Sequence, residues 1–202
     1  MTAKPAKKKA DKPAKKGKVN RRDALLRKAG ELMASKGYEG ASMRSIADAV
    51  GILPGSVYYH FPSKEALFIE LHHNIVTTMT QRVKDAIAAR SDPWERLELA
   101  ACAHLEGLLE TGNQLAIVSP GFAGQPEGIE DVIRGERRTY EDIFRALFDD
   151  LHLPEGTDHT LLRLSFFGTL NWVPVWFQPG GKYKPSDIAL QYISVLRQAY
   201  AG

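Results

Sequence analysis

The stretch that decides the fold lies near the N-terminus and comprises residues 42–67, SMRSIADAVGILPGSVYYHFPSKEAL. Ser42 is a good N-cap for a short helix, and Gly51 can adopt the left-handed backbone that ends one. A second short helix is expected over 54–61, because a proline follows it and breaks the chain. Ser63 then caps a longer helix. Two short helices joined by a tight turn predict a helix-turn-helix.

The two faces of this stretch differ in chemistry. The inward face is apolar and consists of Ile46, Ala47, Val50, Ile52 and Val57. It can pack against Leu25 and Leu32 of a preceding helix, which begins at residue 21 and is closed by Gly37. The outward face of the second short helix carries Pro54, Gly55, Ser56, Tyr58, Tyr59 and His60. Small and hydrogen-bonding groups on an exposed helix fit the major groove of duplex DNA.

The outward residues can be matched to parts of a DNA duplex. Gly55 lets the backbone approach closely, and Ser56 and Tyr59 can donate or accept hydrogen bonds at base edges. The side chains that suit phosphate oxygens are Tyr58, His60 and Lys64. Lys64 also lies at a helix N-terminus, where free N–H groups attract phosphate. The alternative is that Tyr58, Tyr59 and Phe61 only form an aromatic core stripe.

Charge is unevenly distributed along the chain. The first 22 residues hold ten basic side chains and one acid, a net charge of +9, whereas the other 180 hold 17 basic and 23 acidic side chains, net −6. Residues 1–20 are a low-complexity run of Lys, Ala and Pro, and we expect a disordered arm. A basic arm on an acidic body suggests a polyanionic partner such as DNA. A solubilising tail is the alternative.

Helical periodicity continues to the end of the chain. Start and stop signals predict further helices over 64–90, 93–111, 126–151, 157–177 and 185–200. A strong start is Asp92-Pro93-Trp94-Glu95, because Asp caps and Pro suits the first helical position. No segment shows the period-2 alternation of a strand. The expected fold class is therefore all-α.

Two C-terminal segments are too apolar to be covered from one side only. Residues 161–177 are apolar on all faces of a helix, so they must be covered all round. The last helix likewise has two apolar stripes. The two helices predict a four-helix dimer interface, with a buried intramolecular core as the alternative. Pro174 should kink or end the first of them.

Composition excludes several classes of protein. The single cysteine, Cys102, excludes a disulfide framework and a cysteine metal cluster. No apolar run follows the basic N-terminus, and the most apolar segment is too short and polar to span a bilayer, so we expect a cytoplasmic protein without a membrane partner. His72 and His73 point about 100° apart on a helix and cannot easily share a metal. Without a phosphate loop or nucleophile elbow, we expect neither an enzyme nor a cofactor.

The stretch quoted above resembles the tetracycline-repressor-like (TetR) family of regulators, together with the entry helix that ends in Lys36-Gly37-Tyr38. The most specific match is the pattern Gly51-x5-Val-Tyr-Tyr-His-Phe-Pro-Ser-Lys-Glu-Ala-Leu. The resemblance implies a three-helix DNA-binding domain over 21–67, after the arm of residues 1–20. It also implies a larger helical domain over 68–202 for ligand binding and dimerisation.

Roles for individual residues also follow from that resemblance. It implies that Arg44 contacts a base or phosphate from the first short helix. It places Pro54, Gly55, Ser56 and Tyr59 at base edges, and has phosphates held by Tyr58, His60 and Lys64. Many relatives carry a polar or basic residue where Leu53 and Pro54 stand. We therefore expect DNA shape to contribute more than direct readout at those two positions.

A second resemblance concerns the effector. The segment GTLNWVPVWF (168–177) and the turn GILPGSVYYHF look like a subset of the family that responds to acyl-coenzyme A thioesters and controls lipid, sterol or aromatic-acid breakdown. This implies an apolar pocket for the acyl group, with Trp172 and Trp176 as candidate walls. The candidate partners of the coenzyme phosphates are Arg134, Arg137, Arg138 and Lys182. For each arginine the alternative is a solvated helix face with ion pairs to neighbouring acids.

The sequence thus predicts a homodimeric regulator that binds a palindromic duplex and acts as a repressor. A small hydrophobic effector, best matched by an acyl-coenzyme A thioester, is expected to release it. One alternative is the same fold with another effector, such as a drug or a different metabolite. Another is a non-specific DNA-binding protein driven by the Lys-rich arm, against which the acidic body argues.

Overall fold

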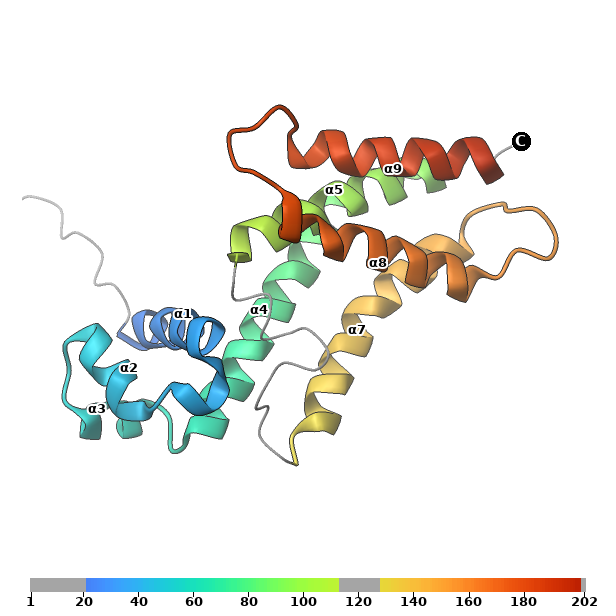
Figure 1. The fold of residues 1–202 in the computed structure, drawn as a ribbon. Helices are drawn as coiled ribbons and strands as arrows, with labels where there is room; N and C mark the ends of the chain where they lie inside the picture. Colours follow the sequence, from blue (N-terminus) through green and yellow to red (C-terminus); the bar gives the residue numbers. More distant parts are fainter. Residues whose placement is uncertain (1–20, 113–127, 201–202) are drawn as a thin grey trace, which may run out of the picture.

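The computed structural model describes residues 21–112 and 128–200. Within these ranges the chain forms helices and no strands, which confirms the all-α prediction for this part of the protein (Figure 1). The helices are α1 (Arg21–Gly40), α2 (Met43–Val50), α3 (Pro54–His60), α4 (Lys64–Ile87), α5 (Pro93–Thr111), α7 (Glu130–Asp149), α8 (His159–Trp176) and α9 (Pro185–Tyr200).

The helix starts follow the side chains that cap them. Ser42 Oγ accepts a hydrogen bond from the Ser45 N–H (3.0 Å), and Ser45 Oγ accepts one from the Ser42 N–H (3.1 Å), which forms a capping box at α2. A side-chain oxygen likewise caps α4 at Ser63, α5 at Asp92 and α8 at Asp158. Each cap satisfies a backbone N–H that has no partner within the helix, so these predicted starts are confirmed.

Gly37 and Gly51, which the sequence places at helix ends, both have a positive φ. Gly51 ends α2 with φ 74° and ψ 36°. Gly37 also has φ 74°, and it interrupts the helical geometry of α1. The chain then makes a further short turn that ends at Gly40. The predicted end of the first helix at Gly37 is therefore an interruption, with helical structure on both sides.

The later helices agree with the predicted ones apart from their ends. α4 ends at Ile87, short of the predicted end at Arg90. The helix predicted over 126–151 corresponds to α7, which begins at Glu130. Pro126 and the apolar piece at 115–118 lie outside the described residues. Pro174 lies inside α8, which ends two residues later at Trp176, as the missing N–H of proline favours.

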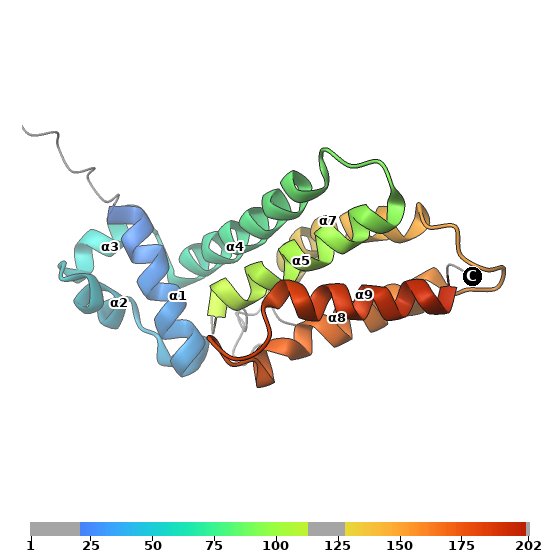
Figure 2. The same cartoon turned by 90° about the horizontal axis from the view of Figure 1, so that it is seen from above.

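The molecule has two ends joined by one helix. α1, α2 and α3 form a unit at one end, and the C-terminal helices extend away from it (Figure 2). α4 begins in the N-terminal unit, where Phe68 packs edge-on against Tyr38 of α1. It then runs along α5, where Gly107 allows close approach because a Cβ there would clash with Met79 Sδ. The expected boundary between residues 67 and 68 thus falls within a continuous helix.

α5 is the central helix of the C-terminal part. It packs against α4 and α9 most extensively and also against α7 and α8. The core there contains fully buried aromatic and aliphatic side chains, among them Leu97, Leu105, Phe144, Phe148 and Phe166. Among the described residues, no helix combines the length and the apolar character that crossing a membrane requires.

Candidate nucleic-acid interface and effector domain

α3 has one buried side and one strongly exposed side. Val57 is fully buried, whereas Tyr59 is 87% exposed and Leu53, just before the helix, is 77% exposed. Tyr58 is also exposed. The alternative prediction that Tyr58, Tyr59 and Phe61 form an aromatic core stripe is therefore wrong for the two tyrosines. It is correct only for Phe61, which is buried. Tyr58 and Tyr59 are thus two neighbouring aromatic side chains available to a partner on this short helix.

The other candidate residues of α2 and α3 are accessible. Arg44 is exposed on α2, and Ser56 is exposed on α3. Pro54 occupies the first position of α3 and is partly buried. A Cβ added at Gly55 would meet only open space, so a docking surface can approach the backbone closely there. His60 is partly buried, and its ring lies edge-on to Tyr59 with the centroids 5.4 Å apart.

Lys64 is held at the start of α4 by contacts with α1. Its Nζ lies 4.0 Å from the centroid of the Tyr38 ring and 3.8 Å from a Glu39 carboxylate oxygen. The Tyr38 hydroxyl donates a hydrogen bond to Glu65 Oε1 (3.1 Å). Burial, reinforced by the Glu65 carboxylate, raises the pKa of Tyr38, so the phenol keeps its proton. These contacts place an ammonium group beside the positive end of the α4 dipole.

An ion pair that sequence reasoning missed ties α1 to α4. The Arg22 guanidinium binds the Glu70 carboxylate through both terminal nitrogens. The same guanidinium lies 4.9 Å from the centroid of the Phe61 ring, just after α3. Arg22, which the charge pattern groups with the basic arm, thus belongs to the folded unit and supports the position of α3. Residues 1–20 lie outside the described residues.

α8 presents an apolar surface, and both tryptophans proposed for effector binding lie on it. Trp172 is 63% exposed and Trp176 is 49% exposed. They share the exposed side of α8 with Leu161, Leu164 and Val175. Leu190 and Val195 are exposed on α9. We call these seven residues the α8–α9 face; their exposed apolar side chains suit a surface that another chain covers.

The basic residues proposed for the coenzyme phosphates lie on α7 and after α8. Arg134 and Arg138 are exposed, and Arg137 is partly buried. Arg134 lies 3.3 Å from Asp131, and Arg137 lies 3.6 Å from Glu141, so both make the helical ion pairs that formed the alternative reading. Lys182 is exposed, and its Nζ lies 5.0 Å from the Tyr183 ring centroid.

A buried polar triad lies where α5, α7 and α8 meet. His104 of α5 is 2% exposed. Its Nδ1 lies 2.7 Å from the Tyr140 hydroxyl of α7, and its Nε2 lies 3.1 Å from Asn171 Oδ1 of α8. Ring centroids at 5.6, 6.3 and 5.4 Å from the imidazole belong to Phe144, Phe166 and Phe167. Burial lowers the pKa of His104 to about 4, against the opposing effect of the Asn171 hydrogen bond, so the imidazole is neutral.

The protons of this triad can be assigned from its chemistry. Asn171 Oδ1 can only accept, so the single imidazole proton is on Nε2 and points at it. The bare Nδ1 then accepts from the Tyr140 hydroxyl. Burial raises the pKa of Tyr140, which keeps that hydroxyl protonated. Sequence reasoning missed this group; its one signal was Asn171 among the apolar side chains of residues 170–177.

A second group of histidines connects α4 to α7. His72 is fully buried, and its Nδ1 lies 2.5 Å from Glu136 Oε2. His73 is exposed, and its Nδ1 lies 2.8 Å from the other oxygen of the same carboxylate. Burial lowers the pKa of His72, although Glu136 opposes this effect. Both imidazoles thus contact the Glu136 carboxylate. The described residues contain no group of side chains that could hold a metal ion.

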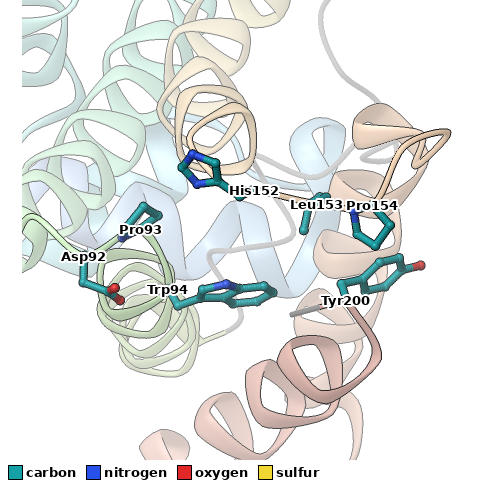
Figure 3. A pocket seen from close by; sticks show the side chains of 7 residues that line it. All are labelled: Asp92, Pro93, Trp94, His152, Leu153, Pro154 and Tyr200. Carbon is teal, nitrogen blue, oxygen red and sulfur yellow. The ribbon is translucent and has the colours of Figure 1, made fainter. Parts of the chain in front are cut away.

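Several hollows open on the surface of the described residues. One of about 580 Å³ lies at the end of the molecule away from α3 (Figure 3), and its lining is Asp92, Pro93, Trp94, His152, Leu153, Pro154 and Tyr200. Another, of about 460 Å³, lies between the segment before α8, α8 itself and the end of α9, and one of about 360 Å³ lies between α1, α4 and α5. None of the six residues proposed for effector binding lines any of these three hollows.

Comparison with known proteins identifies both parts of the chain. Residues 25–71 match the profile described as "Bacterial regulatory proteins, tetR family", and residues 90–200 match "Tetracyclin repressor-like, C-terminal domain". The HTH-type transcriptional repressor KstR2 of Mycobacterium tuberculosis is 30% identical over 187 residues, which covers 89% of this chain and 93% of the relative.

Solved structures share the fold. AibR, solved in complex with isovaleryl coenzyme A and operator DNA, has a TM-score of 0.76 at 24% identity, over 87% of this chain and 97% of AibR. The transcriptional regulator FadR from Bacillus subtilis, solved with stearoyl-CoA, has a TM-score of 0.70 at 24% identity, over 86% of this chain and 96% of FadR.

Proposed function

The chain belongs to the TetR family of bacterial regulatory proteins, and on that premise we propose that it is a cytoplasmic, homodimeric transcriptional repressor. It reads a near-palindromic duplex through α3 and leaves it when a small hydrophobic effector binds. The effector class with most support is an acyl-coenzyme A thioester. The protein acts by binding and release, without a catalytic step.

The observation that carries DNA binding is the exposed side of α3. Tyr59 is 87% exposed on a helix whose opposite side, at Val57, is fully buried. The base-edge side chains of this proposal are Pro54, Gly55, Ser56 and Tyr59, with Arg44 reaching a base or phosphate from α2. The phosphate contacts are Tyr58, His60 and Lys64. The exposed but apolar Leu53 favours readout of DNA shape at its position.

The α8–α9 face supports the homodimer. Two α8–α9 pairs, one from each chain, can cover each other's exposed apolar side chains in a closed two-fold arrangement. A symmetric dimer presents two copies of α3, which read half-sites about one helical turn, or a multiple of it, apart. Binding of both half-sites therefore depends on the dimer.

The acyl-coenzyme A effector is supported by relatives. AibR and FadR are solved with acyl-coenzyme A ligands, and the repressor KstR2 is similar over most of the chain. In this proposal the acyl group lies near Trp172 and Trp176, and the phosphates meet Arg134, Arg137, Arg138 or Lys182. Release requires the effector to bind the off-operator conformation better, and a coupling of roughly 1–3 kcal/mol is sufficient.

The test begins with selection of the operator from random duplex DNA. The operator complex is then titrated with a panel of acyl-coenzyme A thioesters, the corresponding free acids and free coenzyme A. Release by the thioesters alone is the expected result. Equal release by the free acids, or none by any thioester, would contradict the effector class and leave the DNA-binding function standing.

The basic arm contributes affinity without specificity in this proposal. Residues 1–20 contain eight lysines, whose contacts with phosphates release counterions. Deleting them should weaken binding to all duplexes alike and reduce the dependence of affinity on salt. A changed sequence preference with an unchanged salt dependence would contradict this division of roles.

A further inference from the structure

Packing of the C-terminal core does not require polar side chains at the positions of His104, Tyr140 and Asn171. The surrounding core is built from phenylalanine rings, and apolar side chains could fill the same space without loss of stability. The three polar side chains come from three different helices, and they meet at one imidazole. Departures from simple core chemistry of this kind are expected at functional positions.

The triad fixes which way the Asn171 carboxamide points. Its oxygen accepts the N–H of His104 Nε2 (3.1 Å). The carboxamide is planar, so its NH2 group is directed away from the imidazole. Asn171 is exposed at the edge of the triad, whereas His104 and Tyr140 are buried. The exposed Asn171 therefore keeps its two N–H donors free of the imidazole, beside an aromatic core.

These donors suit a neutral carbonyl attached to an apolar group. Phe167, which is partly buried, and the exposed Trp172 provide apolar surface on the same helix. The triad itself carries no positive charge, because burial keeps His104 neutral. A thioester carbonyl meets these conditions better than a free carboxylate, which needs a countercharge.

We propose that the Asn171 NH2 group binds the acyl carbonyl of the effector, and that His104 and Tyr140 are positioning residues that orient this carboxamide. The inference rests on the proposed function, since it takes the effector to be an acyl thioester. α5, which carries His104, packs along α4, the helix that supports the DNA-binding unit. A contact at the triad is thus one helix away from the element that positions α3.

The experiment compares each thioester with the thioether that lacks only its carbonyl oxygen. Release from operator DNA is titrated with butanoyl-, octanoyl- and hexadecanoyl-coenzyme A, and with S-butyl-, S-octyl- and S-hexadecyl-coenzyme A. The most effective thioester should act at about tenfold lower concentration than its thioether, the effect of one hydrogen bond in a partly buried setting. The alkyl chains have the same number of carbons in both ligands, so the ratio reports the replacement of the carbonyl by a methylene.

Four variants separate recognition from folding. Asn171→Leu, with Asn171→Ala as a second version, removes both donors and should bring the ratio to about one. Tyr140→Phe and His104→Phe keep Asn171 but release its orientation, so the ratio should fall to an intermediate value. Ser165→Ala, an exposed change on the same helix, is the matched control and should keep the full ratio. Light scattering and operator affinity verify each variant as a folded dimer.

The outcomes distinguish this inference from the proposed function. A ratio that stays unchanged in both Asn171 variants overturns the inference and leaves the effector class intact. A weakened dimer with an unchanged ratio also overturns it, and assigns Asn171 to the α8–α9 face. If no thioester releases the unchanged chain, the effector class falls and the inference falls with it.

Discussion

α3 and α8 both expose large aromatic side chains, but their surroundings differ. Tyr59 on α3 is 87% exposed and has Gly55 and Ser56 as neighbours on the same short helix. Trp172 on α8 is 63% exposed and shares its side of the helix with aliphatic residues such as Val175. Small polar neighbours suit a hydrated, charged groove, whereas continuous apolar surface suits another protein surface. The neighbours of an exposed ring, more than its exposure, therefore indicate its partner.

The two helices also differ in what lies beneath them. α3 rests on a unit in which neighbouring helices cap and pack one another, and the Arg22–Glu70 ion pair ties that unit to α4. α8 lies over the polar triad around His104. Changes to α3 should therefore alter DNA binding alone, whereas changes at α8 should reach both the dimer and the effector response.

The largest effect is expected from charge on the α8–α9 face. The double substitution Trp172→Glu and Val175→Glu would bury unpaired carboxylates in the dimer, at about 3–5 kcal/mol each. We expect a monomer in light scattering and a loss of operator affinity of about a thousandfold, equivalent to ~4 kcal/mol. Tyr59→Ala is the control and should remain a dimer. A stable dimer in the double variant would remove the α8–α9 face from the interface.

Acid should destabilise the C-terminal core through His104. Its pKa is near 6.5 when unfolded and about 4 when folded. Burial of the neutral imidazole therefore does not reduce the free energy of unfolding above pH 6.5. As the pH falls from about 6.5 towards 4, the unfolded state binds a proton that the folded state does not, and the free energy of unfolding decreases by roughly 3 kcal/mol. Urea unfolding at a series of pH values measures it. His104→Gln cannot titrate and should lose correspondingly less stability over this range; parallel curves would contradict the shift.

A smaller, specific effect is expected on α3. Tyr59→Ala removes the most exposed aromatic side chain of α3. Operator affinity should fall by about 1–3 kcal/mol, the range of one good base contact, with little change on random DNA. Competition binding with both duplexes measures the difference. Equal losses on operator and random DNA would make Tyr59 a backbone contact.

The smallest effect concerns the scaffold beneath α3. Ser42→Ala removes the capping box of α2 and should lower the free energy of unfolding by about 1 kcal/mol. Ser91→Ala changes an exposed serine just before the Asp92 cap and is the control. The dimer should be unaffected by either change, because α2 lies in the N-terminal unit. An equal loss in both variants would show that the capping box adds nothing.

The N-terminal unit was predictable in detail because its signals are local. Caps such as Ser42 and Ser63 act on N–H groups three residues later, and Gly51 ends its own helix. The candidate DNA-binding residues lie on one short segment, so helical geometry alone places them together. Their roles at base edges and phosphates remain predictions.

The contacts between the C-terminal helices could be determined only from the tertiary structure. Periodicity identified α7 and α8 but could not determine how each helix is rotated against its neighbours. His104 is 36 positions from Tyr140 and 67 from Asn171, so only packing brings these side chains to one imidazole. The same holds for Arg22 and Glu70, which are 48 positions apart. Helix identity and ends follow from interactions within a few residues, whereas contacts between helices depend on the shape of the whole core.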